Sequence, residues 1–276
     1  MQDSRRDYEH SDRQFYEHYF AGDQYERDGY QWDAGAVATR AAVQRFITKH
    51  EGKLLEVGVG TGHFLAETTA FCRVGIDLAL VTLQHARQIA PDVPMVQADA
   101  QRLPFCNSAF DVIATTHVME HIPDDRQTAH EFYRVLKPTG EMIAFVPAHM
   151  SGQLPQVEIE QMGHVRTYSR SEIERILNNL FDIEQIYYAH QLYNLFYLPL
   201  KRILRYPNGV VRILLRDRKA FYQRRFYQRL LLPLILTVLD PLDRWVGRVE
   251  FTKVARILQY VEANRCVCVR ARRISR

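Results

Sequence analysis

The sequence predicts an α/β fold with a doubly wound, mostly parallel sheet. Short apolar runs rich in β-branched residues alternate with helical stretches from residue 53 onward, which is typical of strands joined by crossover helices. The first apolar run ends in a glycine-rich turn, the feature that marks nucleotide sites in open α/β sheets. The chain has 276 residues, enough for one sizeable α/β domain with additions.

The expected elements follow from the spacing of the apolar residues. Strands are expected over 53–57, 73–76, 94–97, 110–115, 141–146, 181–188 and 265–272. Helices are expected over 36–50, 62–71, 79–90, 124–136 and 170–180. The last helix should begin with a capping box made by Ser169 and Glu172.

The chain is expected to divide into three parts. These are an aromatic and helical N-terminal cap over 1–50, a core over 51–188 and 263–276, and a basic, hydrophobic helical insert over 189–262. From residue 189 to the end, 19 lysines and arginines stand against 5 acidic residues, a net charge of +14. Since the whole chain carries +4, the remainder carries −10. This asymmetry indicates that the basic part meets an anionic partner.

The insert is the candidate for that contact. Arginines interleave with aromatic residues and leucines, the composition of a helix lying on anionic lipid, so a membrane-surface contact is expected through 192–260. A lid or oligomer contact is the main alternative, and RNA is less favoured. The apolar run 230–239 is about half the length of a bilayer span, and Pro233 interrupts it.

The N-terminus and the cysteines indicate a cytoplasmic protein, with the inner membrane face as the expected place of peripheral contact. Residues 1–7 are polar and contain no signal-peptide core. The four cysteines are scattered, and Cys266-Val267-Cys268 lacks the spacing of a metal-binding pair. Reduced cysteines and no metal site are therefore expected.

The turn after the first strand indicates a nucleotide-like ligand. Gly58, Gly60 and Gly62 follow an apolar run that contains Glu56. His63 stands where a dinucleotide fingerprint needs glycine, and the P-loop ending Gly-Lys-Ser/Thr is absent. The loop is therefore not obviously built for a pyrophosphate, and a glycine turn without ligand remains the alternative.

Carboxylates end the next two strands. Asp77 could accept hydrogen bonds from both hydroxyls of a ribose, or it could cap the helix over 79–90. Asp99 could accept a hydrogen bond from an exocyclic amine, or it could be a plain loop acid.

Together these motifs resemble the class I S-adenosylmethionine-dependent methyltransferases, and within them the small-molecule branch that includes ubiquinone and menaquinone methyltransferases. The matching segments are 55–62, 75–77, 98–100, 103–105, 110–113, 118–122 and 134–138. The resemblance implies a Rossmann-like sheet of seven strands, the last antiparallel, with S-adenosylmethionine as cofactor. Thr139 departs from the pattern, because glycine usually follows Lys-Pro there, and the resemblance fades beyond about residue 188.

The resemblance also implies roles for individual positions. The glycines would line the methionine part of the cofactor, Asp77 would bind the ribose, and Asp99 the adenine amine. The full set of implied cofactor-binding residues is Glu56, Gly58, Gly60, Gly62, Asp77, Leu78, Asp99, Ala100 and Thr116.

The acceptor side is less determined. His117 and His121 are the candidate general bases, with His149 and His164 as further candidates, although His121 could serve packing alone. Substrate contacts are expected from His164, Tyr16 and Tyr19. The alternatives are a loop anchored by Arg166 and an N-terminal segment that only packs on the sheet or stays disordered.

The sequence therefore predicts an enzyme that transfers a methyl group from S-adenosylmethionine to a small-molecule acceptor, lipidic or membrane-associated. An RNA or protein methyltransferase is an alternative, but Thr115-Thr116-His117-Val118 stands where enzymes acting on base amines carry Asn/Asp-Pro-Pro-Tyr. The other alternative is a non-catalytic regulator or scaffold that binds the cofactor. Oligomeric state is not predicted.

Overall fold

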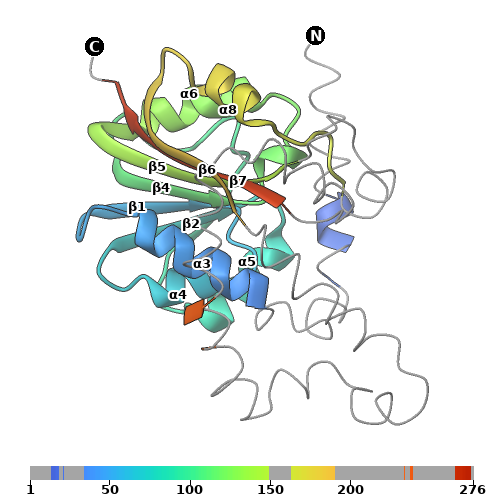
Figure 1. Cartoon of the computed structure of the whole chain (residues 1–276). Coiled ribbons are helices and arrows are strands. Elements are labelled where there is room, and N and C mark those ends of the chain that lie inside the picture. The colour runs from blue at the N-terminus through green and yellow to red at the C-terminus, as the bar shows by residue number, and fades with distance from the viewer. Residues whose placement is uncertain are drawn as a thin grey trace.

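The computed structural model describes residues 14–18, 21, 34–148, 163–189, 233, 237–238 and 265–274 of the chain. Over these residues a seven-stranded sheet is covered by helices on both faces (Figure 1). The strands are β1 (Lys53–Val57), β2 (Cys72–Asp77), β3 (Met95–Gln97), β4 (Phe110–Thr116), β5 (Leu136–Ala148), β6 (Phe181–Ala189) and β7 (Arg265–Arg273). The helices are α3 (Ala34–Phe46), α4 (His63–Glu67), α5 (Leu80–Ile89), the 3₁₀ turn η2 (Met119–His121), α6 (Asp125–Val135) and α8 (Arg170–Leu177).

The strand order is β3-β2-β1-β4-β5-β7-β6. Strands β1 to β5 pair in parallel, and β7 runs antiparallel to both β5 and β6. This confirms the predicted fold class, including the antiparallel last strand. Parallel neighbours need crossover connections, and α4, α5 and α6 provide them.

Three helices, α3, α4 and α8, end three to four residues before the predicted bound, and β5 is longer than predicted. Two of these differences have a clear local cause. Helix α4 ends at Glu67 because the Thr68 hydroxyl donates to the carbonyl of Phe64 at 2.6 Å and closes the last turn. Strand β5 begins at Leu136, earlier than expected, because Pro138 cannot continue a helix. The capping box of α8 is confirmed, since Ser169 and Glu172 bond each other's backbone N–H groups.

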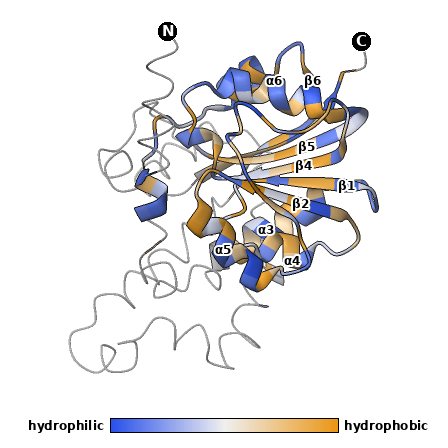
Figure 2. Cartoon of the chain, turned by 180° about the vertical axis from the view of Figure 1, so that it is seen from behind, coloured by the Kyte–Doolittle hydropathy of each residue, from blue (hydrophilic) through white to orange (hydrophobic). Residues whose placement is uncertain are grey.

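The core lies on both faces of the sheet. Helices α3, α4 and α5 cover one face, and α6 and α8 cover the other (Figure 1). Adjacent strand residues alternate between the two layers, so Leu54 packs in one apolar cluster and Leu55 in the other. Apolar colour therefore runs along β4 and β5 while the outer sides of the helices are polar (Figure 2). Burial on both faces is what a parallel sheet requires.

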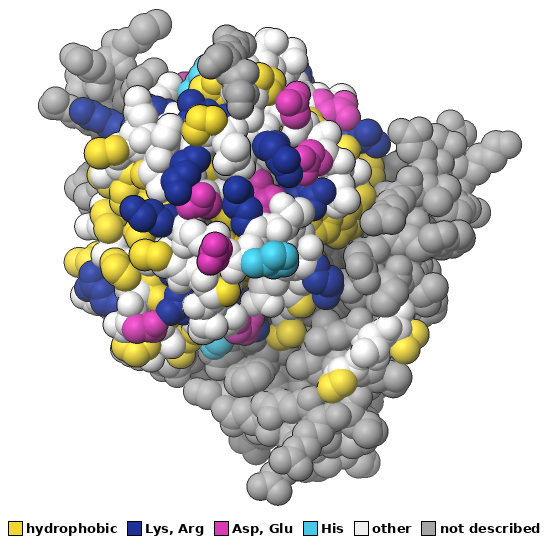
Figure 3. Space-filling model, turned by 90° about the vertical axis from the view of Figure 1, so that its left-hand side faces the viewer, with side chains coloured by type: hydrophobic (Ala, Val, Ile, Leu, Met, Phe, Trp, Pro, Cys, Tyr) yellow, Lys and Arg dark blue, Asp and Glu magenta, His cyan; other side chains and the backbone are white. Residues whose placement is uncertain are grey.

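Several predictions fall outside the described residues. Of the predicted insert, only residues 189, 233, 237 and 238 are described, and Tyr19 and His149 are not. Within the described part of the chain, no helix is both long and apolar enough to cross a membrane. On the face seen in Figure 3, basic and acidic side chains are interspersed.

Candidate functional site

The carboxyl ends of β1 and β4 meet where the strand order reverses. Strand β1 pairs with β2 on one side, Val57 opposite Ile76, and with β4 on the other, Val57 opposite Thr115. The connections from β1 toward β2 and β3 thus run one way, and the later strands lie on the other side. In open α/β sheets, ligands bind at such a switch point, so this edge of the sheet is the candidate site.

The glycine loop after β1 has no room for side chains. Gly58 and Gly62 have φ angles of 77° and 79°, in the left-handed region. A Cβ on Gly58 would lie 2.1 Å from Cγ2 of Val118, which follows β4, and one on Gly62 would lie 2.9 Å from Ala86 of α5. The loop therefore packs closely against α5 and against the segment that follows β4.

Asp77, the last residue of β2, ties this loop to α5. Its carboxylate accepts hydrogen bonds from the backbone N–H of Ala79 at 3.0 Å and of Gly60 at 3.4 Å. Burial raises the pKa of Asp77 to about 6, in spite of these hydrogen bonds. The bond to Ala79 precedes the first turn of α5, so Asp77 does not cap that helix, and the two bonds hold its carboxylate at the glycine loop.

Glu56 adds a second carboxylate below the loop. Its side chain is 5% exposed, and no described group hydrogen-bonds its Oε2. Burial and the nearby Asp77 raise the pKa of Glu56 well above its usual value. Glu56 and Asp77 are thus neighbouring acids whose pKa values are raised by burial. Such a pair favours a bound cation over a bound anion.

The other predicted cofactor residues lie along the same edge. The N–H of Ala98 bonds the carbonyl of Asp77 at 3.0 Å, which places the Asp99 loop beside Asp77. Asp99 accepts from the backbone N–H of Gln101 at 2.8 Å and from its side chain at 3.0 Å, as a loop acid would. Ala100 is buried in the core, the Leu78 carbonyl accepts from Gln97, and Thr116 ends β4.

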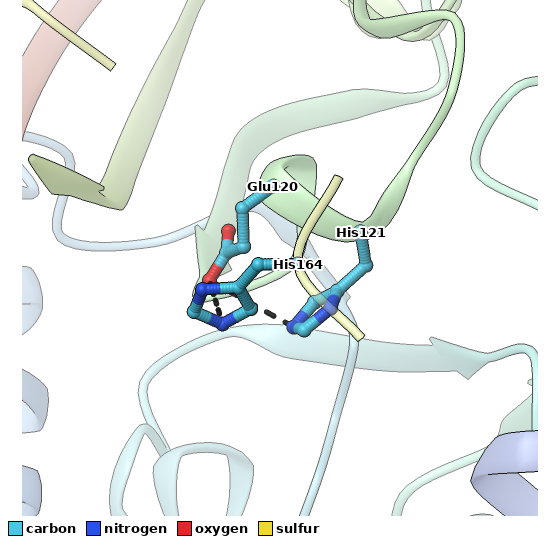
Figure 4. A group of neighbouring side chains, drawn as sticks. All are labelled: Glu120, His121 and His164. Atoms are coloured by element: carbon cyan, nitrogen blue, oxygen red, sulfur yellow. Dashed lines mark ion pairs between the residues drawn. The ribbon is translucent and has the colours of Figure 1, made fainter. Parts of the chain in front are cut away.

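Beyond β4, three histidines converge on one buried carboxylate. Glu120 in η2 is fully buried, and its Oε1 lies 3.4 Å from Nδ1 of His117, 3.8 Å from Nε2 of His121 and 3.9 Å from Nε2 of His164. Figure 4 shows His164 reaching the pair in η2 from a separate segment. His117 has a φ of 56°, an uncommon backbone conformation for a residue other than glycine. Glu120 was not predicted as a site residue, although it stands beside His121 and three residues after His117.

The charges of this cluster are set by mutual contacts. Burial raises the pKa of Glu120, but His117 and His121 outweigh it and bring that pKa below its usual value. Burial lowers the pKa of His117, but Cys266 and Glu120 outweigh it and raise that pKa well above its usual range. Burial lowers the pKa of His121. Near neutral pH, Glu120 is therefore ionised and His121 is neutral.

The N-terminal segment closes over this cluster. The hydroxyl of Tyr16 lies 2.6 Å from Nδ1 of His121. The carboxylate of Glu17 accepts from the backbone N–H groups of Leu80 and Val81 at 2.6 and 3.1 Å, at the start of α5. Residues 14–18 therefore bridge the cofactor side and the histidine side. Glu17 was not predicted, because an acid that caps a distant helix leaves no local pattern.

Arg166 anchors the segment that carries His164. Its guanidinium contacts Asp125 at 2.5 Å and the carbonyl of Pro123 at 2.5 Å. The neighbouring Tyr168 donates to the carbonyl of Met119 at 3.0 Å. The predicted anchor is thus present, and it holds His164 against Glu120.

Comparison with known proteins agrees with this architecture. Residues 55–144 match the family model described as Methyltransferase domain. A demethylmenaquinone methyltransferase of Corynebacterium urealyticum is 36% identical over 93 residues, which cover 33% of this chain and 39% of that protein. A malonyl-[acyl-carrier protein] O-methyltransferase of Yersinia pestis is 25% identical over 197 residues, covering 67% and 68%. The chain thus spans less than two thirds of the first relative.

Among solved structures, N-methyltransferase NodS from Bradyrhizobium japonicum WM9, in complex with S-adenosyl-L-homocysteine, has the same fold. The TM-score is 0.56 at 13% identity, covering 95% of this chain and 98% of that one. Residues 55–144 thus match a methyltransferase domain, and the described residues share the fold of this solved structure. Over 93 and 107 residues, the chain is similar to two demethylmenaquinone methyltransferases.

S-adenosylmethionine, the cofactor that this resemblance implies, fits the residues present. The ligand carries cationic sulfonium and ammonium groups, and Glu56, which is buried, and Asp77, which is half-buried, supply carboxylates. The unpartnered Oε2 of Glu56 offers an acceptor, and the left-handed turns at Gly58 and Gly62 hold the loop in one tight conformation.

Proposed function

We propose that this protein transfers a methyl group from S-adenosylmethionine to a small, lipidic acceptor. One observation carries the proposal: at the sheet's switch point, a glycine loop lies beside the carboxylates of buried Glu56 and half-buried Asp77, and the histidine cluster follows the neighbouring strand β4. The first part suits a cationic nucleoside, and the second suits a proton-bearing acceptor.

The donor side is assigned to the loop and to the strand ends. Glu56, Gly58, Gly60 and Gly62 would surround the methionine part, Asp77 and Leu78 the ribose, and Asp99 and Ala100 the adenine, with Thr116 facing the methyl group. The cofactor supplies an activated methyl bound to a cationic sulfur. The chain's own residues hold the acceptor in line with that bond, an arrangement that contributes roughly 7–11 kcal/mol in the best cases.

The acceptor side is assigned to His117, His121, His164 and Tyr16. In the reaction, the acceptor atom forms a bond to the methyl carbon while the carbon–sulfur bond breaks. The electron pair of the broken bond stays on sulfur. The acceptor's proton must leave. His121 is neutral, and with its Nδ1 proton directed at the carbonyl of Gly163, its Nε2 can receive that proton.

Two observations support a lipidic acceptor. Demethylmenaquinone, named in a similar protein, is an isoprenoid quinone. The insert of this chain also combines arginines with aromatic residues and leucines, as helices at anionic lipid surfaces do.

A labelled-methyl assay on fractionated cell extract tests the activity. Label entering the lipid fraction with the native protein, and lost with Asp77→Ala, would support the proposal. Label in RNA or protein would favour the alternative acceptors, and cofactor binding without any transfer would favour a scaffold.

Flotation with vesicles tests the membrane contact. The full chain should float with anionic but not with zwitterionic vesicles, and less at high salt. An Arg224/Arg225/Arg229→Gln variant should lose flotation. The matched variant Arg102/Arg126/Arg175→Gln changes three exposed arginines outside the insert and should keep flotation. Equal flotation of both variants would refute a membrane role for the insert.

A further inference from the structure

The geometry points to a divalent transition-metal site formed by Glu120, His121 and His164. One donor atom from each side chain lies within 4.8 Å of the others, and all three side chains turn toward one point (Figure 4). Ligands of a tetrahedral zinc ion lie about 3.3 Å apart, since each is 2.0–2.1 Å from the metal. The distances of 3.8 and 3.9 Å from Glu120 Oε1 to the two imidazoles need a contraction of about 0.5 Å, and the widest separation in the group, at most 4.8 Å, needs up to about 1.5 Å.

The state of Glu120 is the second observation. Its side chain is fully buried, and its Oε1 pairs with Nδ1 of His117 at 3.4 Å. No described group hydrogen-bonds its Oε2. A buried carboxylate oxygen without a partner is costly, and proteins compensate buried charges by pairing or by coordinating a metal.

The second ring nitrogen of His121 is held as a metal ligand's would be. Its Nδ1 lies 3.3 Å from the carbonyl of Gly163 and 2.6 Å from the Tyr16 hydroxyl. A proton on Nδ1 that donates to the carbonyl leaves the Nε2 lone pair directed at Glu120. Metal-binding histidines are oriented by hydrogen bonds of this kind.

The donor set indicates which ions would bind. Two imidazoles and one carboxylate suit Zn²⁺ or Fe²⁺, whereas Mg²⁺ and Ca²⁺ prefer oxygen ligands alone. Three protein ligands leave a coordination position open, as in catalytic rather than structural sites. The prediction of no metal site rested on the spacing of the cysteines. This cluster contains no cysteine, so that spacing gave no sign of it.

A role for the ion in catalysis rests on the proposed function. An acceptor hydroxyl at the open position would lose its proton more easily, because a bound cation stabilises the oxyanion. His121 would then orient the ion, and the acceptor's proton would pass to solvent or to a neighbouring base. Binding of the ion does not depend on methyl transfer and is measured without it.

The test uses the full chain, stripped with a chelator and titrated with Zn²⁺ against a chromophoric chelator. We expect one tight equivalent. Glu120→Gln should weaken binding by about a hundredfold or more, since loss of an outer-shell partner alone costs 10–100-fold. The control His130→Asn removes an exposed histidine of α6 and should bind as the native protein does. No tight equivalent, or equal affinity of Glu120→Gln, would overturn the site.

X-ray absorption on the native zinc-loaded protein keeps the proposal testable if Glu120→Gln fails to fold. The expected shell contains only nitrogen and oxygen at about 2.0–2.1 Å, with outer scattering from imidazole. Sulfur at about 2.3 Å would mean that a cysteine holds the ion and would overturn the assignment. A metal-free protein that still binds S-adenosylmethionine and transfers methyl groups would refute a catalytic role for the ion and leave the proposed function standing.

Discussion

Tyr16 and His121 lie 105 positions apart in the chain, and the phenol oxygen of one stands 2.6 Å from Nδ1 of the other. Their rings meet edge to face, with centroids 5.3 Å apart. Glu17, the next residue, caps α5 with its carboxylate. The N-terminal segment is thereby fastened at both sides of the switch point, so its chemistry belongs to the site.

Tyr16→Phe should lower the rate of methyl transfer while leaving cofactor affinity unchanged. The substitution removes one hydroxyl that touches a histidine of the acceptor side, and one such hydrogen bond is worth about 0.5–1.5 kcal/mol, or up to roughly tenfold. Steady-state kinetics and calorimetry with S-adenosylhomocysteine measure the two effects. Tyr133→Phe is the control, because that hydroxyl bonds the carbonyl of Ile274 at the far end of the sheet. Equal loss in both variants would indicate a general effect on folding.

Cofactor binding should weaken as the pH falls through about 6. Burial raises the pKa of Asp77 to about 6, and the protonated carboxyl accepts ribose hydrogen bonds poorly. Affinity for S-adenosylhomocysteine should therefore be about tenfold lower at pH 5 than at pH 7.5, if only the ionised form binds. Asp77→Asn should bind weakly at both values. Glu56→Gln keeps Asp77 and should retain the dependence, so its loss there would reassign the titration to Glu56.

Gly58→Ala should destabilise the domain by about 3 kcal/mol, from a left-handed φ and from overpacking against Val118. Urea unfolding measures the change. The double variant with Val118→Ala removes the clash but keeps the backbone strain, so it should recover part of the loss. Full stability of Gly58→Ala would mean that the loop can relax, contrary to the tight contact seen between β1 and β4.

Glu131→Gln should destabilise the native protein most above pH 5, and the difference should shrink as the pH falls below about 4. Glu131 accepts two hydrogen bonds from Arg134, at 2.7 and 2.8 Å, and one from the backbone of Leu103, and Arg134 chiefly lowers its pKa. A lowered pKa contributes stability above the unfolded value of about 4.3, and that contribution disappears as the pH falls through the folded value. Unfolding curves of both proteins between pH 3 and 7 check this. A constant difference across that range would contradict it.

Local patterns determined much of this protein. Short continuous apolar runs located β1, β2 and β4 within a residue or two, because a parallel strand that is buried on both faces is apolar at consecutive positions. The glycines at 58 and 62 were readable because their φ angles suit few other residues. The donor site follows from these elements, since consecutive parallel strands end at one edge.

The histidine cluster that we assign to the acceptor is formed only by the tertiary structure. Tyr16 and His164 reach Glu120 and His121 from segments far away in the sequence, and no periodicity encodes that meeting. The strand order brings β4 beside β1, η2 follows β4, and the anchored 163–169 segment folds back over it. Burial then gives Glu120 its importance, because the same residue in solvent would be an ordinary surface acid.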